Sequence, residues 1–305
     1  MDGPDYVVKI RIEQGYPFRS LIESLKHITE SVTWFFSQEK FIISDVSESS
    51  STGVRILSGA EFPKAGMIDY QFYHDKVITE EEEFWVLSTN AGGLRDQMKS
   101  ISRGQKMEII VQRDSRFLIR PYDERGNKDY VNTITGVVPN DPSLVVFSHP
   151  IPEDLPTCKY STSDLQKLCS GFKVGGKTDS HILFKLSAGN DGILVQHCDT
   201  KRGGRIQQIG NYTHKVDQGG GISELLSDIT FESPSEAAAD ITLTFQGHDS
   251  SSNYSAKVPM IILKALSKVS TISAQSVVRF YMKEGVPLKF LIPISTLGYW
   301  RLYLD

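Results

Sequence analysis

The sequence has little of what marks secreted, membrane-spanning or metal-binding proteins. Three cysteines occur among 305 residues, and no two of them have the C-x-x-C spacing of a zinc or redox site. No run of eighteen apolar residues occurs, and the first residues include two aspartates rather than a basic stretch that leads into an apolar one. We therefore expect reduced thiols, no disulfide framework, and a protein that is neither inserted into a membrane nor secreted.

Patterns of enzymatic chemistry are also scarce. The seven histidines show no H-x-x-x-H or H-x-H spacing, and no G-x-S-x-G nucleophile turn is present. No pair of carboxylates stands out from the other acidic residues as a general acid and base. The sequence thus predicts no catalytic residue, no metal site and no cofactor.

One string argues for an enzyme. Residues Gly171–Thr178 match the P-loop pattern G-x-x-x-x-G-K-[ST] at every fixed position. Phosphate binding by such a loop needs a buried strand before it and a helix that starts at the Lys-Thr pair. Here a predicted helix precedes the string and a β-rich segment follows it. We interpret the glycines as a helix stop and a turn, and a P-loop NTPase stays a remote alternative.

The residues that are abundant are typical of a folded, weakly acidic protein. Hydrophobic residues make up 39% and charged residues 23% of the chain, with 15 Phe and 12 Tyr, which is enough for a large core. The formal net charge is −4, so the protein as a whole repels phosphate. A nucleic-acid role therefore requires positive charge gathered on one face.

The predicted elements repeat in order along the chain. Apolar spacing predicts helices over residues 18–30, 94–101, 163–172 and 260–269, and short β-rich segments follow in each half, including 6–12, 32–36, 41–46, 288–293 and 300–304. Between the halves, residues 139–156 hold five prolines, which resist both helix and sheet interior. We predict an α+β protein with two similar domains, residues 1–138 and 157–305, joined by a connector at 139–156.

Each predicted helix carries a basic row opposite its apolar row. A solvated face is the simplest interpretation for one helix, but all four helices share the pattern. A polyanion held through phosphate contacts alone, without sequence readout, would explain it. The residues of these rows and their flanks are Arg19, Lys26, Arg95, Lys99, Arg103, Lys167, Lys173, Lys264 and Lys268.

Five segments, in order along nearly the whole chain, carry a family resemblance. They are GYPFRSLIESLK (Gly15–Lys26), IPE (151–153), DGI (191–193), VPL (286–288) and LGYWRLYL (297–304). Their order and spacing resemble the sliding clamp proliferating cell nuclear antigen (PCNA), in which they correspond to the first helix, the segment after the connector, a second-domain hairpin and the closing strands. The connector is longer than in that family, and residues 248–257 look inserted. Length and divergence favour a member from a protist or a large DNA virus.

The resemblance implies the DNA clamp fold, with two domains that each have curved antiparallel sheets and two helices on the inner face. Three chains would close head to tail into a ring around duplex DNA, and the strand near 130–137 of one chain would pair with 205–212 of the next. The implied partners are double-stranded DNA, a DNA polymerase, other proteins with a clamp-binding motif and a clamp loader. The implied location is the nucleus or another site of DNA replication, such as a viral replication compartment.

The resemblance also implies a pocket into which client proteins insert a short aromatic-bearing peptide, under the connector and beside the C-terminal strand. Val146 and Phe147 are proline-flanked and have little core to join, which favours this role. An ordinary core position is the competing interpretation for the remaining residues. The implied pocket consists of Val46, Leu144, Val146, Phe147, Ile151, Pro287, Tyr303 and Leu304.

Two alternatives stay open among binding proteins. One is a clamp-fold processivity factor that acts as a monomer or dimer, and the other is one subunit of a checkpoint ring built from different chains. The homotrimer is the prediction, and the mass of the assembly in solution distinguishes the three.

Overall fold

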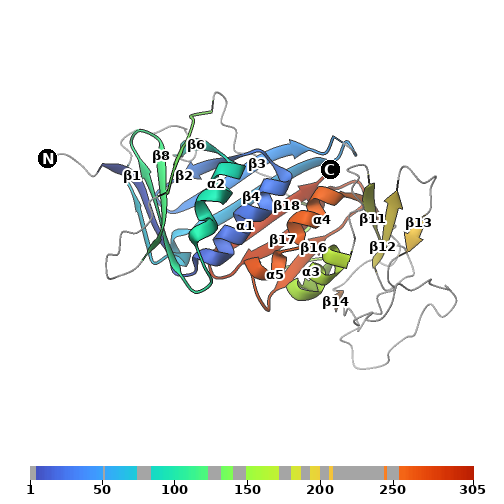
Figure 1. Cartoon of the computed structure of the whole chain (residues 1–305). Helices are drawn as coiled ribbons and strands as arrows, with labels where there is room; N and C mark the ends of the chain where they lie inside the picture. Colours follow the sequence, from blue (N-terminus) through green and yellow to red (C-terminus); the bar gives the residue numbers. More distant parts are fainter. Residues whose placement is uncertain are drawn as a thin grey trace.

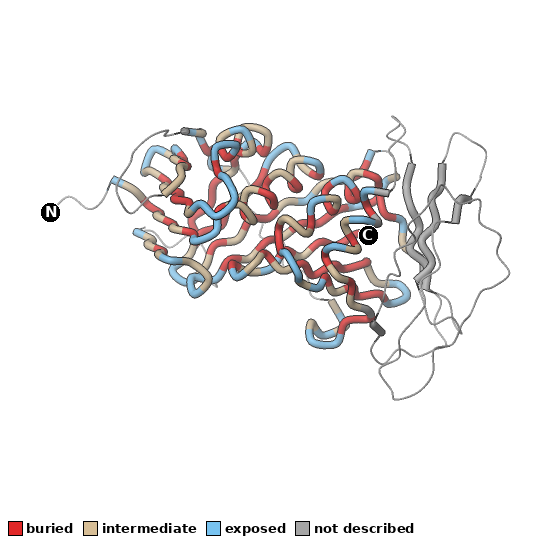
Figure 2. The backbone as a smooth tube through the Cα atoms, turned by 60° about the horizontal axis from the view of Figure 1, so that its bottom comes forward, coloured by how far each residue is buried: buried red, intermediate tan, exposed pale blue. Residues whose placement is uncertain are grey.

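The computed structural model describes residues 5–50, 52–73, 84–122, 132–139, 149–171, 180–186, 193–199, 206–208, 244–245 and 254–305. Within these ranges, a layer of helices lies on one side of a large β-sheet (Figure 1). Buried backbone runs through the interior of this sheet-and-helix body, and exposed residues gather on its turns (Figure 2).

The first half of the chain supplies strands β1 to β9 and two helices. The helices are α1 (Gly15–Ile28) and α2 (Ala91–Gln97), and the short 3-10 turns are η1 (Lys64–Gly66) and η2 (Met98–Ser100). The strands are β1 (Tyr6–Ile12), β2 (Ser31–Phe36), β3 (Lys40–Glu48), β4 (Arg55–Pro63), β5 (Asp69–Phe72), β6 (Trp85–Asn90), β7 (Lys106–Gln112), β8 (Arg116–Tyr122) and β9 (Asn132–Thr135).

The second half supplies the remaining described elements. Its helices are α3 (Thr162–Gly171), α4 (Met260–Leu266) and α5 (Val269–Ile272). Its strands are β10 (Cys158–Ser161), β11 (Ser180–Leu186), β12 (Ile193–Asp199), β13 (Ile206–Gln208), β14 (Thr244–Phe245), β15 (Tyr254–Pro259), β16 (Val277–Tyr281), β17 (Leu288–Ile294) and β18 (Gly298–Leu304).

Antiparallel pairing joins the two halves into one continuous sheet. Its nine strands have the order β14-β10-β16-β17-β18-β4-β3-β2-β6, and the pairing of β18 with β4 crosses from one half to the other. A five-stranded sheet, β5-β1-β7-β8-β9, and a four-stranded sheet, β13-β12-β11-β15, complete the described strands. One hydrophobic core extends through both halves, so the helices of each half rest on a shared support.

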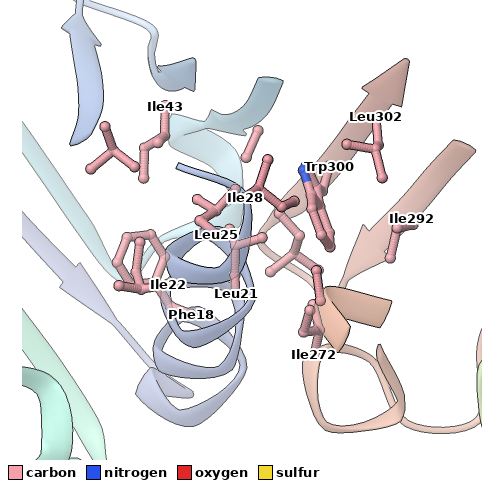
Figure 3. Close-up of a cluster of buried hydrophobic side chains, with 14 of the residues drawn as sticks. Phe18, Leu21, Ile22, Leu25, Ile28, Ile43, Ile272, Ile292, Trp300 and Leu302 are labelled. Atoms are coloured by element: carbon pink, nitrogen blue, oxygen red, sulfur yellow. The ribbon is translucent and has the colours of Figure 1, made fainter. Parts of the chain in front are cut away.

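Helix α1 forms because its apolar residues recur at helical spacing and face the sheet (Figure 3). Its ring at Phe18 lies 5.2 Å from the ring of Phe62 and 6.1 Å from that of Trp34. Pro17 sits in the first turn, where a missing N–H costs no helical hydrogen bond. Burial of each large apolar side chain contributes about 1.5–3 kcal/mol. The buried apolar residues of α1 are Phe18, Leu21, Ile22, Leu25 and Ile28.

The helices pack against one another as well as on the sheet. Helix α1 contacts α2 on one side and α4 and α5 on the other, and α3 contacts α4 and α5. Helices α1 and α4 run in opposite directions (Figure 1). The layer therefore places side chains from four chain segments side by side on one face.

Gly298 shows why the closing segment Leu297–Leu304 needs its glycine. Its φ is +157°, and a Cβ at this position would lie 2.0 Å from the carbonyl oxygen of Glu61 on β4. Only glycine lets β18 approach β4 this closely where the two halves pair.

Most expected elements are present, with boundaries that differ in places. The strand expected over 6–12 is confirmed, whereas α1 begins at Gly15 rather than Phe18 because proline is tolerated in a first turn. The helix expected over 260–269 is divided at Ser267 and Lys268 into α4 and α5. The α+β clamp fold class is confirmed by the comparisons given below.

Candidate nucleic-acid interface and outer-face groove

The structure brings the predicted basic residues to the helical layer. Arg19 and Lys26 belong to α1, Arg95 to α2 and Lys99 to η2, and Arg103 follows η2 in a turn; Lys167 belongs to α3, Lys264 to α4 and Lys268 to the junction of α4 and α5. Lys173 lies outside the described residues. We call the described members of this set the basic face.

His27 lies among cations of the basic face, and their positive charge changes its pKa. Desolvation by the packed helices holds the pKa of His27 below its ordinary value, although its side chain remains exposed. The positive charges of Lys268, Lys264, Lys26 and Arg95 lower the pKa further. These four cations come from α1, α2, α4 and the junction of α4 with α5, so residues far apart in sequence act on one point.

The cations differ in how far they are already paired. Glu23 accepts from Arg19 Nε at 2.8 Å and from Lys268 Nζ at 2.6 Å, which links α1 to α5. Asp96 pairs with Arg95 and, at 3.2 Å, with Lys99. Asp164 pairs with Lys167 at 3.3 Å.

Lys26 and Lys264 have no acidic partner among the described residues, and both belong to the basic face. Arg103 also has no acidic partner among those residues, but its guanidinium lies over the ring of Tyr16, so Lys26 and Lys264 are the most available charges of this face. The acidic residues that neutralise part of this face were not predicted, because only the basic rows were considered along the helices.

Arg19 has a structural role that its place in the basic row did not predict. Its guanidinium donates to the carbonyl oxygens of Lys99 and Ile101 at 2.9 and 2.8 Å, which fastens the end of η2 to α1. Arg19 and Arg103 also lie over the ring of Tyr16, at 5.7 and 5.3 Å from its centroid. Arg19 is thus mostly occupied with holding the helices together.

The opposite face of the large sheet carries a row of side chains across five strands. Strand pairing aligns Tyr281, Lys289, Tyr303, Leu57 and Val46, in that order, on β16, β17, β18, β4 and β3. We call this the outer row. None of its members belongs to the core cluster beneath the helices, and Val46 is 37% exposed. Two predicted pocket residues, Val46 and Tyr303, therefore lie together on the sheet face away from the helices.

A cavity of about 700 Å³ opens where the loops after β3 and β16 meet β15 and the end of β18. Pro287 and Leu304, two of the expected pocket residues, line it, although the side chain of Leu304 also belongs to the core. Ala256, Lys257 and Glu284 add an apolar surface and two charges of opposite sign. The cavity therefore offers room for a side chain that is both apolar and polar.

The remaining predicted pocket residues are placed in part. Ile151 follows His149, and its backbone N–H donates to His149 Nδ1 at 3.2 Å, while His149 Nε2 lies 3.3 Å from the carbonyl oxygen of Pro287. This contact brings the segment after the connector to the edge of the cavity. Leu144, Val146 and Phe147 lie outside the described residues.

Glu153 fastens the segment after the connector to the outer face of the sheet. Its carboxylate accepts from Lys289 Nζ at 2.7 Å and from Arg301 Nε at 2.8 Å, and its backbone oxygen accepts from the hydroxyl of Tyr281 at 2.6 Å. Burial opposes ionisation, but these cationic donors outweigh it and lower the pKa of Glu153 to about 2. We call Glu153, Lys289 and Arg301 the clasp.

Lys289 is almost fully buried, and no sequence pattern marked it. Its ammonium lies 4.8 Å from the ring centroid of Tyr281 and 5.6 Å from that of Tyr303. The aromatic faces and the Glu153 carboxylate together compensate for the loss of water around this charge.

The order of the elements around the P-loop pattern argues against a nucleotide site. Helix α3 ends at Gly171 and β11 begins at Ser180, so helix precedes loop and strand follows it. Residues 172–179 themselves lie outside the described ranges. Across the described ranges, no cluster of His, Cys, Asp and Glu has the geometry to hold a metal ion, and no helix is long and apolar enough to cross a membrane.

The architecture defines the class of protein. Two halves with paired helices on one face of antiparallel sheets constitute a clamp-type fold. In particular, this is the fold of proliferating cell nuclear antigen. The chain matches the PCNA2–PCNA3 complex from Sulfolobus tokodaii with a TM-score of 0.63 and 12% sequence identity, over 97% of this chain and 98% of the matched chain.

A second solved structure gives the same result. Proliferating cellular nuclear antigen from Entamoeba histolytica matches with a TM-score of 0.63 and 12% identity, over 98% of both chains. No protein-family model and no curated protein sequence matches the chain. The structural similarity confirms the predicted clamp fold, in a sequence that has diverged far from both solved structures.

Proposed function

We propose that this protein is a non-enzymatic DNA sliding clamp that encircles duplex DNA and tethers a DNA polymerase and other client proteins to it. The observation that carries the proposal is the basic face, on which cations from three helices surround one histidine in a protein of net charge −4. Such segregation of charge is what a phosphate-binding surface on an acidic protein requires.

The partial neutralisation of the basic face supports a sliding contact rather than tight binding. Glu23, Asp96 and Asp164 each pair with at least one of its cations, which leaves Lys26 and Lys264 as its most available charges. A closed ring is retained on DNA by topology, so its phosphate contacts need only be weak and exchangeable. Strong contacts would slow movement along the duplex.

The outer row and the adjoining cavity support the client-binding part of the proposal. The outer row lies on the face of the sheet away from the helices, so a client bound there leaves the basic face free. Val46 offers exposed apolar surface next to the buried Leu57, and the cavity at the ends of the strands offers a second site. An aromatic side chain of a client peptide would bury most of its surface against the outer row or in the cavity.

The test is charge reversal of the most available cations. We expect the double variant Lys26→Glu and Lys264→Glu to bind a fluorescent duplex more weakly at low salt, measured by anisotropy. The slope of log affinity against log salt should fall by ~0.9 for each DNA phosphate that the protein no longer neutralises, without a change in sequence preference.

The matched control is Lys64→Glu with Arg116→Glu, which makes the same change in net charge at two exposed positions outside the helices. An equal loss of duplex binding in both double variants would contradict the proposal, because net charge alone would then explain binding. Wild-type protein that binds no duplex at any salt concentration would contradict it as well.

A further inference from the structure

We infer that His27 is a proton-linked phosphate contact, so that this protein takes up a proton when its basic face meets a nucleic-acid backbone. The inference rests on the proposed function and adds a specific pH dependence to it. It starts from the position of one neutral titratable side chain among cations.

The packing of α1 against α4 places His27 on the same surface as the cations. Glu23 and His27 are one turn apart on α1, and Lys264 and Lys268 are one turn apart across α4 and its junction with α5. Lys268 Nζ bonds Glu23 at 2.6 Å. Helices α1 and α4 run in opposite directions (Figure 1), so the next turn along brings His27 toward Lys264, whose charge acts on the ring.

The charged groups around His27 come from each helix packed against α1. On α1 itself they are Glu23 and Lys26, with Glu30 just beyond the helix. On α2 and η2 they are Arg95, Asp96 and Lys99, and on α4 and α5 they are Lys264 and Lys268. Glu23 and Asp96 are already paired with cations, and the charges that act most strongly on the ring are those of Lys268, Lys264, Lys26 and Arg95 rather than Glu30, so the field at the ring is positive.

Burial and this field disfavour protonation of the imidazole while the face is empty. Desolvation and then the nearby cations hold the pKa of His27 below its ordinary value of about 6.5. A phosphate that binds the cations cancels their repulsion and adds attraction for an imidazolium. An opposite charge within about 4–6 Å raises a pKa by about 1 unit or more, so the ring takes up its proton at a higher pH in the complex than in the free protein.

The sign of the resulting pH dependence follows from linkage. Because the complex binds the proton more tightly than the free protein, duplex affinity rises as pH falls through the window between the two pKa values. A pKa increase of about 1 unit corresponds to an affinity increase of about tenfold across the full window. Above this window the ring is neutral in the complex as well, so the contact with the phosphate is weaker there.

The direct test is NMR of the full-length protein with labelled histidine rings, at low salt, with and without a 30-base-pair duplex. The spectrum of His27→Gln assigns the His27 signal among the seven histidines. We expect the pKa of His27 to rise when duplex is added. An unchanged pKa, under conditions where the duplex demonstrably binds, would overturn the inference.

Duplex affinity measured from pH 8 to pH 5.5 gives an independent readout. His27→Gln should lose the part of the pH dependence that wild type shows, and its affinity should match that of wild type at pH 8. His27→Lys should bind more tightly at pH 8 and show a salt slope steeper by ~0.9. Equal pH dependence in wild type and His27→Gln would refute the inference and leave the clamp proposal intact, whereas no duplex binding by wild type at any pH would refute the clamp proposal itself.

Discussion

Val46 is the residue at which the client-binding proposal is most directly tested. It lies in the outer row between solvent and the buried Leu57, and 37% of its surface is exposed. We predict that Val46→Glu weakens binding of a fluorescent peptide with a clamp-binding motif by tenfold or more, because a carboxylate would be desolvated by the bound aromatic side chain. Thermal unfolding should change little, since surface substitutions usually alter stability by about 0.5 kcal/mol or less.

Ile68 provides the matched control for Val46. It is 46% exposed and lies between η1 and β5, away from the outer row. Ile68→Glu adds the same charge to an exposed aliphatic position and should leave peptide affinity unchanged. If Val46→Glu bound the peptide as wild type does, the outer row would not be the client site.

Single residues also show which roles could be predicted from the sequence and which could not. The basic residues could be predicted because a lysine on the polar side of an amphipathic helix is exposed wherever the helix packs. Glu23 and Lys289 could not be selected, because their roles depend on partners 245 and 136 residues away in the chain. Pairing across such distances leaves no periodic signal in a single sequence.

At the scale of elements, the clasp determines how the segment after the connector lies on the sheet. Glu153 ionises readily because of Lys289 and Arg301, and its pKa of about 2 is below the ordinary value for a glutamate. Because the pKa of Glu153 is lower in the folded protein than in the unfolded chain, its ionised carboxylate stabilises the fold at pH values above about 4.5. This stabilisation is lost as pH falls from about 4.5 toward 2. We predict that chemical denaturation at several pH values will show wild type losing more stability in this window than Glu153→Gln.

Glu13 gives the control for the clasp prediction. Its carboxylate is 60% exposed and pairs with Lys106 at 3.2 Å, a geometry that contributes little to stability. Glu13→Gln should therefore follow the wild-type curve. Parallel curves for wild type and Glu153→Gln would show that the clasp contributes nothing that depends on protonation.

The type of most elements was predictable, but their junctions were not. Helix α1 and strands such as β1 have strong local periodicity, which survives any tertiary context. The division between α4 and α5 has no proline or glycine to mark it, since it falls at Ser267 and Lys268. The pairing of β18 with β4 joins the last strand of the chain to one in its first quarter, and no local pattern in the sequence predicts it.

At the scale of the whole molecule, the two ends of the described fold present strand edges. Strand β9 ends the order of the five-stranded sheet, and β13 ends that of the four-stranded sheet. Exposed edges invite pairing with another chain. Strand β9 lies within residues 130–137 and β13 within residues 205–212, the two segments that we expect to pair between neighbouring chains. This pairing stays a prediction.

The mass of the assembly is the last prediction. Head-to-tail pairing of β9 with β13 produces a closed ring only if the rotation from one subunit to the next returns to the first. We expect light scattering at micromolar concentration to give three times the chain mass of 34.1 kDa. Thr133→Asp with Thr135→Asp, at exposed positions of β9, should lower this mass because two carboxylates at the edge oppose strand pairing. Ser102→Asp with Thr296→Asp, at exposed positions outside both edges, should keep the mass of wild type. A wild-type mass of one or two chains would instead favour a processivity factor that works without a homotrimeric ring, or a subunit that needs different chains to close one.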